Sequence, residues 1–323
     1  MDEVFDTVIP MKAVAEVMPS GADWAYEIKW DGMRILAHTD GERLVLRSSN
    51  GIDATLRFPE LADLPDAVGN RAAILDGEVV AFADGLPSFS ALQKRMHLTN
   101  KSEVESRMAE VPVSFVIFDL LYFDGTYATS VPYEQRRQLL ENLVEPGPTW
   151  RLTDVHEDGE ALLDVVRANN LEGLVAKRLD ATYQPGRRSP LWRKVKVRRH
   201  QEFVVGGWSR RKTAEKSRSE MIGSLFVGYY DGDDFRYAGR VGSGLSDKEI
   251  SRLLGIFEPL VRADCPFAEV PSEPEARTAT WLEPQVVAEV AFADWSGDGK
   301  LRQPSYLGQR IDTEPTTITR EPQ

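Results

Sequence analysis

The segment Glu27-Ile28-Lys29-Trp30-Asp31-Gly32-Met33-Arg34 places a lysine at the end of an apolar strand, directly before an Asp-Gly turn. Strand-forming residues on both sides of the turn, 24–29 and 34–38, predict two strands. The amine of Lys29 would then stand at a turn beside a cleft. On this motif alone, a reactive lysine and an ordinary surface hairpin are equally supported interpretations.

Short strands and two helices account for the first half of the chain. Helices are predicted at residues 133–144, after Pro132, and at residues 159–169, because leucine and valine recur there on one side of a helix. Strands are predicted where β-branched and aromatic runs end at Gly, Asp or Pro, at residues 24–29, 34–38, 43–47, 73–82, 113–123, 173–177 and 191–197. This mixed order predicts an α+β fold of antiparallel sheets with helices rather than a doubly wound parallel sheet.

A different pattern follows the basic stretch near Arg199. Strands are predicted at residues 203–208, 224–230, 235–241 and 286–292, and Ser246 with Glu249 forms a capping box that begins a helix. Four or five strands with one helix predict a small β-barrel of the OB-fold type. The expected division is a first domain of residues 1–199, an OB-fold domain of residues 200–313 and a frayed C-terminal tail of residues 314–323, with residues 266–284 as a surface loop.

Composition excludes several classes of protein. Among the 323 residues, 42% are hydrophobic and 28% charged, which suffices for a sizeable core in each of two domains. No apolar run is long enough to span a bilayer, and the acidic N-terminus lacks the features of a signal peptide. Cys265 is the single cysteine, so the chain cannot form an internal disulfide, and the scattered histidines predict no structural zinc. We expect a cytoplasmic protein that associates with no membrane.

The charge of the chain is strongly polarised. The net charge of −12, from 39 basic and 51 acidic residues, argues on average against binding nucleic acid. Between Gly186 and Ser219, however, basic residues dominate and only Glu202 and Glu215 oppose them. The basic residues are Arg187, Arg188, Arg193, Lys194, Lys196, Arg198, Arg199, Arg210, Arg211, Lys212, Lys216 and Arg218. This distribution predicts one face that binds a polyanion.

Six further segments along the chain contain charged, aromatic or glycine residues of the kinds found in active-site motifs. They are Arg47-Ser48-Ser49-Asn50-Gly51, Leu75-Asp76-Gly77-Glu78, Phe118-Asp119-Leu120-Leu121-Tyr122, Glu172-Gly173-Leu174-Val175-Ala176-Lys177, Leu191-Trp192-Arg193-Lys194-Val195-Lys196 and Leu301-Arg302-Gln303-Pro304-Ser305-Tyr306-Leu307-Gly308-Gln309-Arg310. Together with Lys-x-Asp-Gly-x-Arg, they resemble the motifs of ATP-dependent ligases and mRNA-capping guanylyltransferases. Three other segments, at residues 182–189, 227–232 and 237–242, are similar to the ATP-dependent DNA ligases of bacterial non-homologous end joining in their free-standing short form.

The resemblance implies a nucleotidyltransferase (adenylation) domain at residues 1–199, an ATP cofactor and a lysyl-AMP intermediate on Lys29. Lys194 and Lys196 would contact the α-phosphate, and Glu172 would bind Mg²⁺ or Mn²⁺. The remaining nucleotide contacts would come from Glu27, Ile28, Arg34, Glu78, Phe118, Val175, Arg302 and Arg310. An ordinary lysine pKa is about 10.4, and we expect the nearby cations and a bound metal to lower that of Lys29 so that it can attack as a neutral amine.

Simpler interpretations of these residues stay open at this point. Phe118 fits ordinary core packing, and Glu78 fits an ion pair with a neighbouring cation. Lys194 and Lys196 alternate with valine, so they also fit the solvated face of a strand.

The same resemblance implies broken or nicked duplex DNA as the substrate. Arg47, Arg187, Arg188, Arg210, Arg211 and Lys212 would contact the DNA backbone. Ser49 stands where many relatives carry an arginine for the 5′-phosphate, and Arg47 is a candidate to replace it. We expect a monomeric DNA-repair enzyme that a Ku-type end-binding protein assists. The alternatives are an RNA ligase or guanylyltransferase with the same core, and a non-catalytic protein that binds DNA ends.

Overall fold

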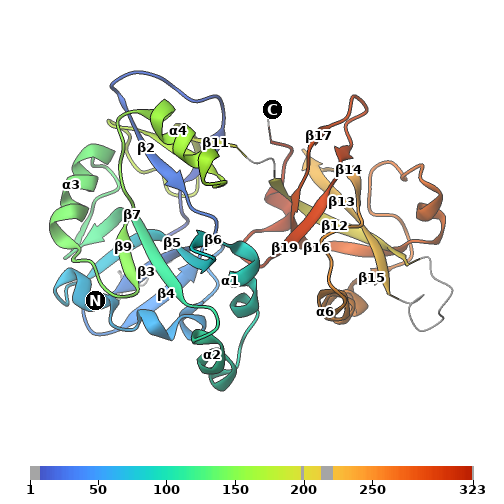
Figure 1. The fold of residues 1–323 in the computed structure, drawn as a ribbon, viewed down its shortest axis with the longest axis horizontal. Helices are drawn as coiled ribbons and strands as arrows, with labels where there is room; N and C mark the ends of the chain where they lie inside the picture. The colour runs from blue at the N-terminus through green and yellow to red at the C-terminus, as the bar shows by residue number, and fades with distance from the viewer. Residues whose placement is uncertain (1–7, 198–199, 212–220, 322–323) are drawn as a thin grey trace. The chain divides into compact units, whose positions relative to one another are not determined.

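The chain forms two compact units. The computed structural model describes residues 8–197, 200–211 and 221–321 and divides into unit 1, Met1–Arg198, and unit 2, Arg199–Pro322 (Figure 1). Unit 1 contains two sheets with helices, and unit 2 contains one large sheet, a short hairpin and a helix.

A four-stranded sheet forms one layer of unit 1. Its order is β1-β11-β10-β2, in which β1 and β11 run parallel and the other pairs antiparallel. The strands are β1 (Lys12–Ala15), β2 (Trp24–Lys29), β10 (Gly173–Arg178) and β11 (Arg188–Lys196). Helix α4 (Gly159–Ala168) covers one face of this sheet, where its leucine and valine side chains pack against β2 and β10 (Figure 1). The other face is left for the polar side chains of the same strands.

A seven-stranded sheet forms the second layer of unit 1. Its central order is β4-β3-β5-β7-β8, with β6 paired to β5 and β9 paired to β7. The strands are β3 (Met33–Thr39), β4 (Leu44–Ser48), β5 (Ala73–Ala83), β6 (Leu86–Pro87), β7 (Val113–Phe123), β8 (Thr126–Tyr127) and β9 (Trp150–Leu152). Every pair is antiparallel except β7 with β9. This arrangement confirms the predicted α+β class.

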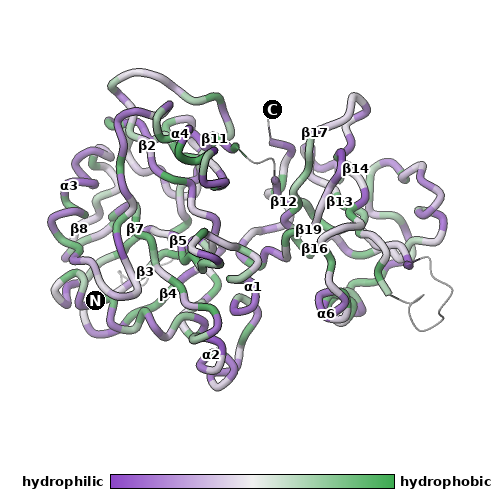
Figure 2. The backbone as a smooth tube through the Cα atoms, in the orientation of Figure 1, coloured by the Kyte–Doolittle hydropathy of each residue, from purple (hydrophilic) through white to green (hydrophobic). Residues whose placement is uncertain are grey.

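Helices α1 (Phe89–Met96) and α3 (Tyr133–Leu143) pack against the seven-stranded sheet, and α2 (Lys101–Met108) packs against α1 and the turn at Thr55–Arg57. Helix α3 is held to β7 by a buried bidentate pair, in which the Nε and Nη2 atoms of Arg136 donate to Asp119 at 2.8 and 2.9 Å. Helix α2 is largely hydrophilic and buries only Val104 (Figure 2). Single turns of 3₁₀-helix lie at Thr55–Arg57, Pro59–Leu61, Leu64–Val68, Glu258–Leu260, Pro274–Thr278 and Pro315–Thr317.

Unit 2 has the topology of an OB-fold. Its sheet runs β14-β13-β12-β16-β15, and β19 also pairs with β16. A bridge between Ser243, just after β14, and Ser305, at the start of β19, closes the ring. The strands are β12 (His200–Arg210), β13 (Ile222–Asp231), β14 (Asp234–Val241), β15 (Val261–Arg262), β16 (Thr280–Ala291) and β19 (Ser305–Arg310), with α6 (Asp247–Phe257) and a hairpin of β17 (Asp294–Trp295) and β18 (Leu301–Arg302). The closed order confirms the predicted OB-fold, and Ser246 caps α6 as expected.

The C-terminal tail differs from the prediction. Residues 314–321 were expected to fray, but Ile318 is buried and its carbonyl accepts a hydrogen bond from Tyr230 N at 2.7 Å. The side chain of Gln201 donates to the carbonyl of Thr319 at 2.9 Å. One apolar side chain therefore anchors an otherwise polar segment to the barrel. Similarly, the expected surface loop at residues 266–284 sends Phe267 into a second core of unit 2 and contains the start of β16.

Candidate active site

One face of the four-stranded sheet gathers the lysines that the sequence singled out. On the strands either side of β10, Lys29 and Lys196 are in register with Gly173. Two residues further along β10, Glu27 and Lys194 are in register with Val175. Residues that pair across a sheet point to the same side, as do residues two apart along a strand. Lys29, Lys194, Lys196, Glu27 and Val175 therefore share a face, of which only the part with Lys194 and Lys196 was predicted.

Ile28 lies on the opposite face. Its side chain packs into the cluster that α4 forms with β2 and β10. Strand alternation puts Ile28 there, because its neighbours Glu27 and Lys29 occupy the other side. The structure thus separates the side chain of Ile28 from the other predicted nucleotide contacts, and only its backbone borders their face.

Glu172 stands directly before β10 and faces two lysines. Its Oε2 accepts a hydrogen bond from Lys29 Nζ, and its Oε1 lies 4.0 Å from Lys196 Nζ. Gly173, the next residue, allows the backbones of the two adjacent strands to pack closely, because a Cβ there would lie 2.1 Å from the carbonyl oxygen of Val195. Glycine is therefore required between the two lysines by close packing of the backbone.

The protein groups alone raise the pKa of Lys29, and the predicted lowering, which included a bound metal ion, stays a prediction. Burial lowers the pKa of this ammonium group, but the charge and hydrogen bond of Glu172, together with the charges of Glu78 and Asp31, outweigh burial and raise it above its ordinary value. The prediction named the nearby cations and a bound metal, and it did not include the ion pair with Glu172. In this state, Lys29 is an ammonium ion paired with Glu172.

The second sheet of unit 1 supplies Glu78 and Phe118. Glu78 on β5 is in register with Arg34 on β3. The ring of Phe118 on β7 packs edge-on against Trp192 at 6.3 Å between ring centroids, and the Nζ of Lys177 lies 4.6 Å from its centroid. Trp192 and Lys177 belong to the four-stranded sheet. Phe118 therefore lies where the two sheets meet, half-buried beside the lysine face.

Arg34 is engaged within the protein. Its Nε and Nη2 donate to the two oxygens of Asp76 at 3.0 and 2.7 Å, and its Nη1 donates to the carbonyl of Met11 at 2.7 Å. Burial lowers the pKa of the Arg34 guanidinium, but the charge of Asp76 and other contacts outweigh burial and raise it. These contacts join β3, β5 and the N-terminal segment, so they support a structural role. A nucleotide contact by Arg34 stays a prediction.

A buried cluster that the sequence did not reveal lies beneath this face. Glu27 Oε1 accepts from Tyr133 Oη at 2.5 Å and pairs with Lys177 Nζ at 2.9 Å. Lys177 Nζ also lies 4.5 Å from the centroid of Trp192 and donates to the carbonyl of Phe118 at 3.1 Å. Burial lowers the pKa of Lys177 despite the charge of Glu27. The sequence does indicate which side of the sheet Lys177 occupies, because Lys177 follows Gly173 and Val175 at the two-residue spacing of a strand.

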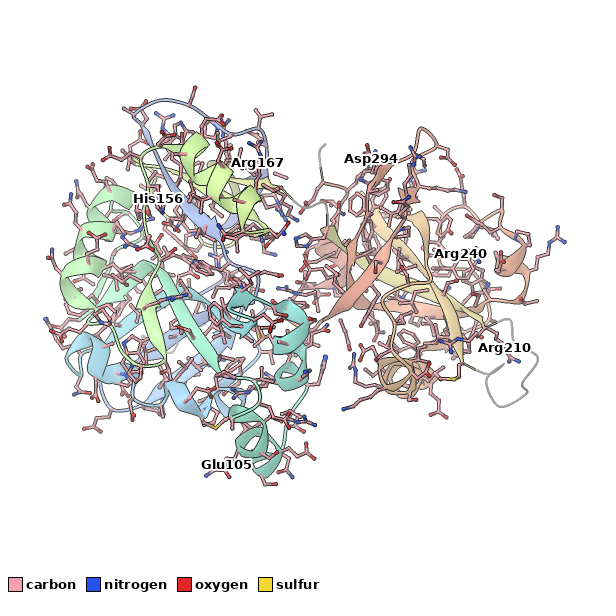
Figure 3. All side chains as sticks on the ribbon, viewed as in Figure 1. Glu105, His156, Arg167, Arg210, Arg240 and Asp294 are labelled. Carbon is pink, nitrogen blue, oxygen red and sulfur yellow. The ribbon has the colours of Figure 1, made fainter. Side chains whose placement is uncertain are left out.

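The predicted DNA contacts are distributed over both units. Arg47 Nη1 donates to the carbonyl of Gly51 at 3.4 Å, and Ser49 lies just after the end of β4, so the replacement of the missing arginine by Arg47 stays a prediction. Arg187 is exposed, and Arg188 donates to the carbonyl of Ala13 at 2.9 Å. In unit 2, Arg210 is exposed at the end of β12 (Figure 3), Arg211 pairs with Asp247 at 3.2 Å, and Lys212 lies outside the described residues.

The two predicted phosphate-binding arginines of unit 2 differ in their surroundings. Arg302 is exposed on β18. Arg310 is surrounded by carboxylates: it donates to Asp312 at 2.9 and 2.7 Å and to Glu289 at 3.2 Å, and it lies 3.5 Å from Glu202. Burial lowers the pKa of Arg310, but these carboxylates outweigh burial and raise it. Arg310 thus organises the end of the barrel, and its contact with pyrophosphate stays a prediction.

Glu172 is the carboxylate that the sequence predicted to bind a cation, and this role stays a prediction. Among the described residues, no group of three or more His, Cys, Asp or Glu side chains is arranged to hold a metal ion. A single carboxylate fits Mg²⁺, which commonly binds through one or two carboxylates together with substrate phosphates and water. The described chain also has no helix that is both long enough and apolar enough to cross a membrane.

Comparison with known proteins covers nearly the whole chain. A family model described as the ATP dependent DNA ligase domain matches residues 8–196, and one described as the ATP dependent DNA ligase C terminal region matches residues 218–313. The multifunctional non-homologous end joining DNA repair protein LigD of Mycobacterium tuberculosis is 37% identical over 320 residues, which cover 98% of this chain and 40% of that protein. DNA ligase C1 of Mycolicibacterium smegmatis is 33% identical, over 96% of this chain and 92% of that protein.

A solved structure is similar over nearly the whole chain. The structure titled mycobacterial DNA ligase D complexed with ATP and MES superposes with a TM-score of 0.67 at 35% sequence identity, covering 98% of this chain and 99% of that one. The identity is well above the level at which only the fold is shared, and the match includes both units. With its nucleotidyltransferase domain and its OB-fold domain, this chain belongs to the family of ATP-dependent DNA ligases.

Proposed function

We propose that this ligase joins a 5′-phosphate to a 3′-hydroxyl in DNA through an AMP group carried on Lys29. The observation that supports this most strongly is the row of Lys29, Gly173 and Lys196 beside Glu172. It combines one amine at the end of a strand with a second cation on the same face and a carboxylate between them. A solvated strand face would not require a glycine at its centre or a nearly buried carboxylate.

The first step is attack by Lys29 Nζ on the α-phosphorus of ATP. A nitrogen–phosphorus bond forms, the bond to the pyrophosphate oxygen breaks, and pyrophosphate leaves with the electron pair. The ammonium group must release one proton before the attack and a second one after it, both to solvent. Lys194 and Lys196, on the same face, would stabilise the negative charge that develops on the phosphate oxygens.

Glu172 and a divalent cation connect this step to the pKa of Lys29. The carboxylate of Glu172 fits a Mg²⁺ or Mn²⁺ site, and a cation bound there would supply positive charge beside Lys29. That charge would cancel the main influence that raises the pKa of Lys29. In the absence of a cation, Glu172 keeps Lys29 protonated and unreactive, so activation would depend on loading the site.

The AMP then moves to the 5′-phosphate of a DNA break, and the 3′-hydroxyl displaces AMP to seal the strand. We propose a role in DNA repair by end joining, with a Ku-type protein as partner, in a cytoplasmic and monomeric enzyme. The likeness to LigD, a protein named for non-homologous end joining, supports this role, although the chain spans about 40% of the length of that relative. DNA ligase C1, by contrast, is matched over 92% of its length.

A nick-sealing assay tests the proposal. The protein is incubated with a divalent cation and either labelled ATP or labelled GTP, and then with duplexes that carry a single nick in DNA or in RNA. We expect label transfer from ATP and sealing of the DNA nick, both lost in Lys29→Ala. Labelling by GTP alone, or sealing of RNA alone, would contradict the proposal in favour of a guanylyltransferase or an RNA ligase.

A further inference from the structure

Arg151 lies over two aromatic rings close to the proposed nucleophile. The carbon of its guanidinium is 5.2 Å from the ring centroid of Trp30 and 5.5 Å from that of Phe82. Trp30 directly follows Lys29 in the chain, and its indole N–H donates to Thr153 Oγ1 at 3.0 Å. The hydrogen bond holds the indole in place, so the platform beneath Arg151 is fixed.

Strand register puts Arg151 on the same face as Glu78. Arg34 pairs with Glu78, Glu78 with Val116, and Val116 with Arg151, in one row across β3, β5, β7 and β9. Strands in a sheet are about 4.8 Å apart, so Arg151 stands roughly 10 Å from Glu78 along this row. The row leads from the proposed nucleotide site to the exposed edge strand of the sheet.

The charge of Arg151 is not neutralised within the protein. Its side chain is exposed, and among the described residues no carboxylate forms an ion pair with it. Arg34, by contrast, is paired with Asp76, and Arg310 is surrounded by three carboxylates. Stacking occupies the faces of a guanidinium group and leaves its in-plane N–H donors available, which matches the geometry of a phosphate group.

We propose that Arg151 binds a backbone phosphate of the DNA strand beside the break. The inference rests on the proposed function, which brings DNA to Lys29. A phosphate of ATP could in principle offer the same chemistry. The DNA backbone is the better match, because Arg151 is on the exposed edge strand, whereas Phe118, Lys177 and Trp192 mark the nucleotide site where the two sheets meet.

The first test is direct binding of fluorescent nicked DNA to full-length Arg151→Ala protein across a series of salt concentrations, which requires no catalysis. We expect about tenfold weaker binding, the loss of one charge-assisted contact. The slope of log affinity against log salt should fall by roughly 0.9, the value for one phosphate contact. Arg151→Lys should bind with intermediate affinity, since it keeps the charge but loses the planar fork.

A matched control is Arg167→Ala. Arg167 is an exposed arginine of the same unit, on α4 (Figure 3), but its Nη1 pairs with Asp164 at 3.1 Å. Its removal should leave DNA affinity and the salt slope unchanged. Melting curves of both variants should match the parent, because each side chain is exposed.

The second test separates DNA from ATP as the source of the phosphate. Arg151→Ala should keep the parent KM for ATP in self-adenylylation and should lose about tenfold in kcat/KM for sealing DNA that already carries the 5′-AMP. A raised KM for ATP with normal sealing would assign Arg151 to the nucleotide and overturn the proposal. Unchanged DNA affinity and salt slope would overturn it as well. Failure of the parent protein to adenylylate would contradict the proposed function instead, and the binding test would still stand.

Discussion

Lys29 and Lys196 lie in register on either side of Gly173, and both face the carboxylate of Glu172. Strand β2 and the strands β10 and β11, which are far from it in the sequence, thus converge on one ion pair. The arrangement gives the proposed nucleophile a partner that keeps it protonated, and it places a second cation where phosphate charge would develop. Activation of Lys29 therefore depends on the charge of Glu172.

Gly173→Ala should disrupt this row. The added Cβ would lie 2.1 Å from the carbonyl oxygen of Val195, so β10 and β11 would have to separate. We expect a loss of about 1–3 kcal/mol in the free energy of unfolding, with little self-adenylylation remaining. Thermal melting and label transfer from ATP measure both effects. Gly255→Ala in α6 is the control: a Cβ there meets nothing within 4 Å, and the change should slightly stabilise the helix. Normal melting and activity of Gly173→Ala would contradict the account.

Glu172→Gln should make Lys29 reactive at lower pH. Burial lowers the pKa of Lys29, and the Glu172 carboxylate is the largest of the influences that raise it above the ordinary value. Only the neutral amine reacts, so a raised pKa moves the onset of reactivity to higher pH. Removal of the carboxylate should move it back toward or below the ordinary value of about 10.4.

The measurement is the rate at which an acylating reagent labels Lys29 in metal-free, nucleotide-free protein, followed by peptide mapping from pH 7 upward. At each alkaline pH we expect faster labelling in Glu172→Gln than in the parent. Equal rates, or slower labelling in the variant, would show that Glu172 does not control this amine.

Arg34 and Asp76 should contribute to stability as a pair. Asp76 is fully buried and Arg34 mostly so, and removal of one partner leaves an uncompensated charge. Such changes cost about 3–5 kcal/mol, so Asp76→Asn should lower the free energy of unfolding markedly. Asp124→Asn, in the exposed pair of Asp124 with Arg71, should cost at most about 1 kcal/mol. Chemical denaturation compares the two, and equal small losses would argue against a structural role for Arg34.

Ile318→Ala should weaken the attachment of the C-terminal segment to the barrel. Ile318 is buried in the second core of unit 2, and its loss should lower the free energy of unfolding by about 2 kcal/mol. Thr316→Ala, an exposed neighbour, should change it by less than about 0.5 kcal/mol. Limited proteolysis should release the segment faster in Ile318→Ala. If both variants behave alike, the segment frays as its polarity suggests.

The sequence predicted the elements that carry a strong local signal. The bounds of β2 and β7 match the structure, because alternation and turn residues mark both ends. Helix α2 was missed because it buries a single side chain, and the packed tail was missed because Ile318 is one apolar residue among polar ones. Both depend on tertiary contacts that periodicity does not register.

The sequence predicted which strand face carries some of the candidate residues, but not the ion pairs that they form. Strand spacing placed Lys194 and Lys196 on one face, as the structure has them. The ion pair that raises the pKa of Lys29 was not foreseen, because the approach of Glu172 depends on how β10 pairs with β2, and the lowering by a bound metal stays a prediction. Lys177 was missed because a lysine at the end of a strand ordinarily reaches solvent, and its burial is decided by three aromatic rings from other segments.

The most direct test of the central claim is mass spectrometry of the full-length protein after incubation with ATP and a divalent cation. We predict one AMP group per chain, bound to the peptide that contains Lys29. The adduct should be stable at neutral pH in the absence of hydroxylamine, and it should be discharged when nicked DNA is added. Lys29→Arg should carry none, while Lys248→Arg, an exposed lysine at the start of α6, should carry as much as the parent. AMP on a different residue, or sealing by Lys29→Arg at the parent rate, would contradict it.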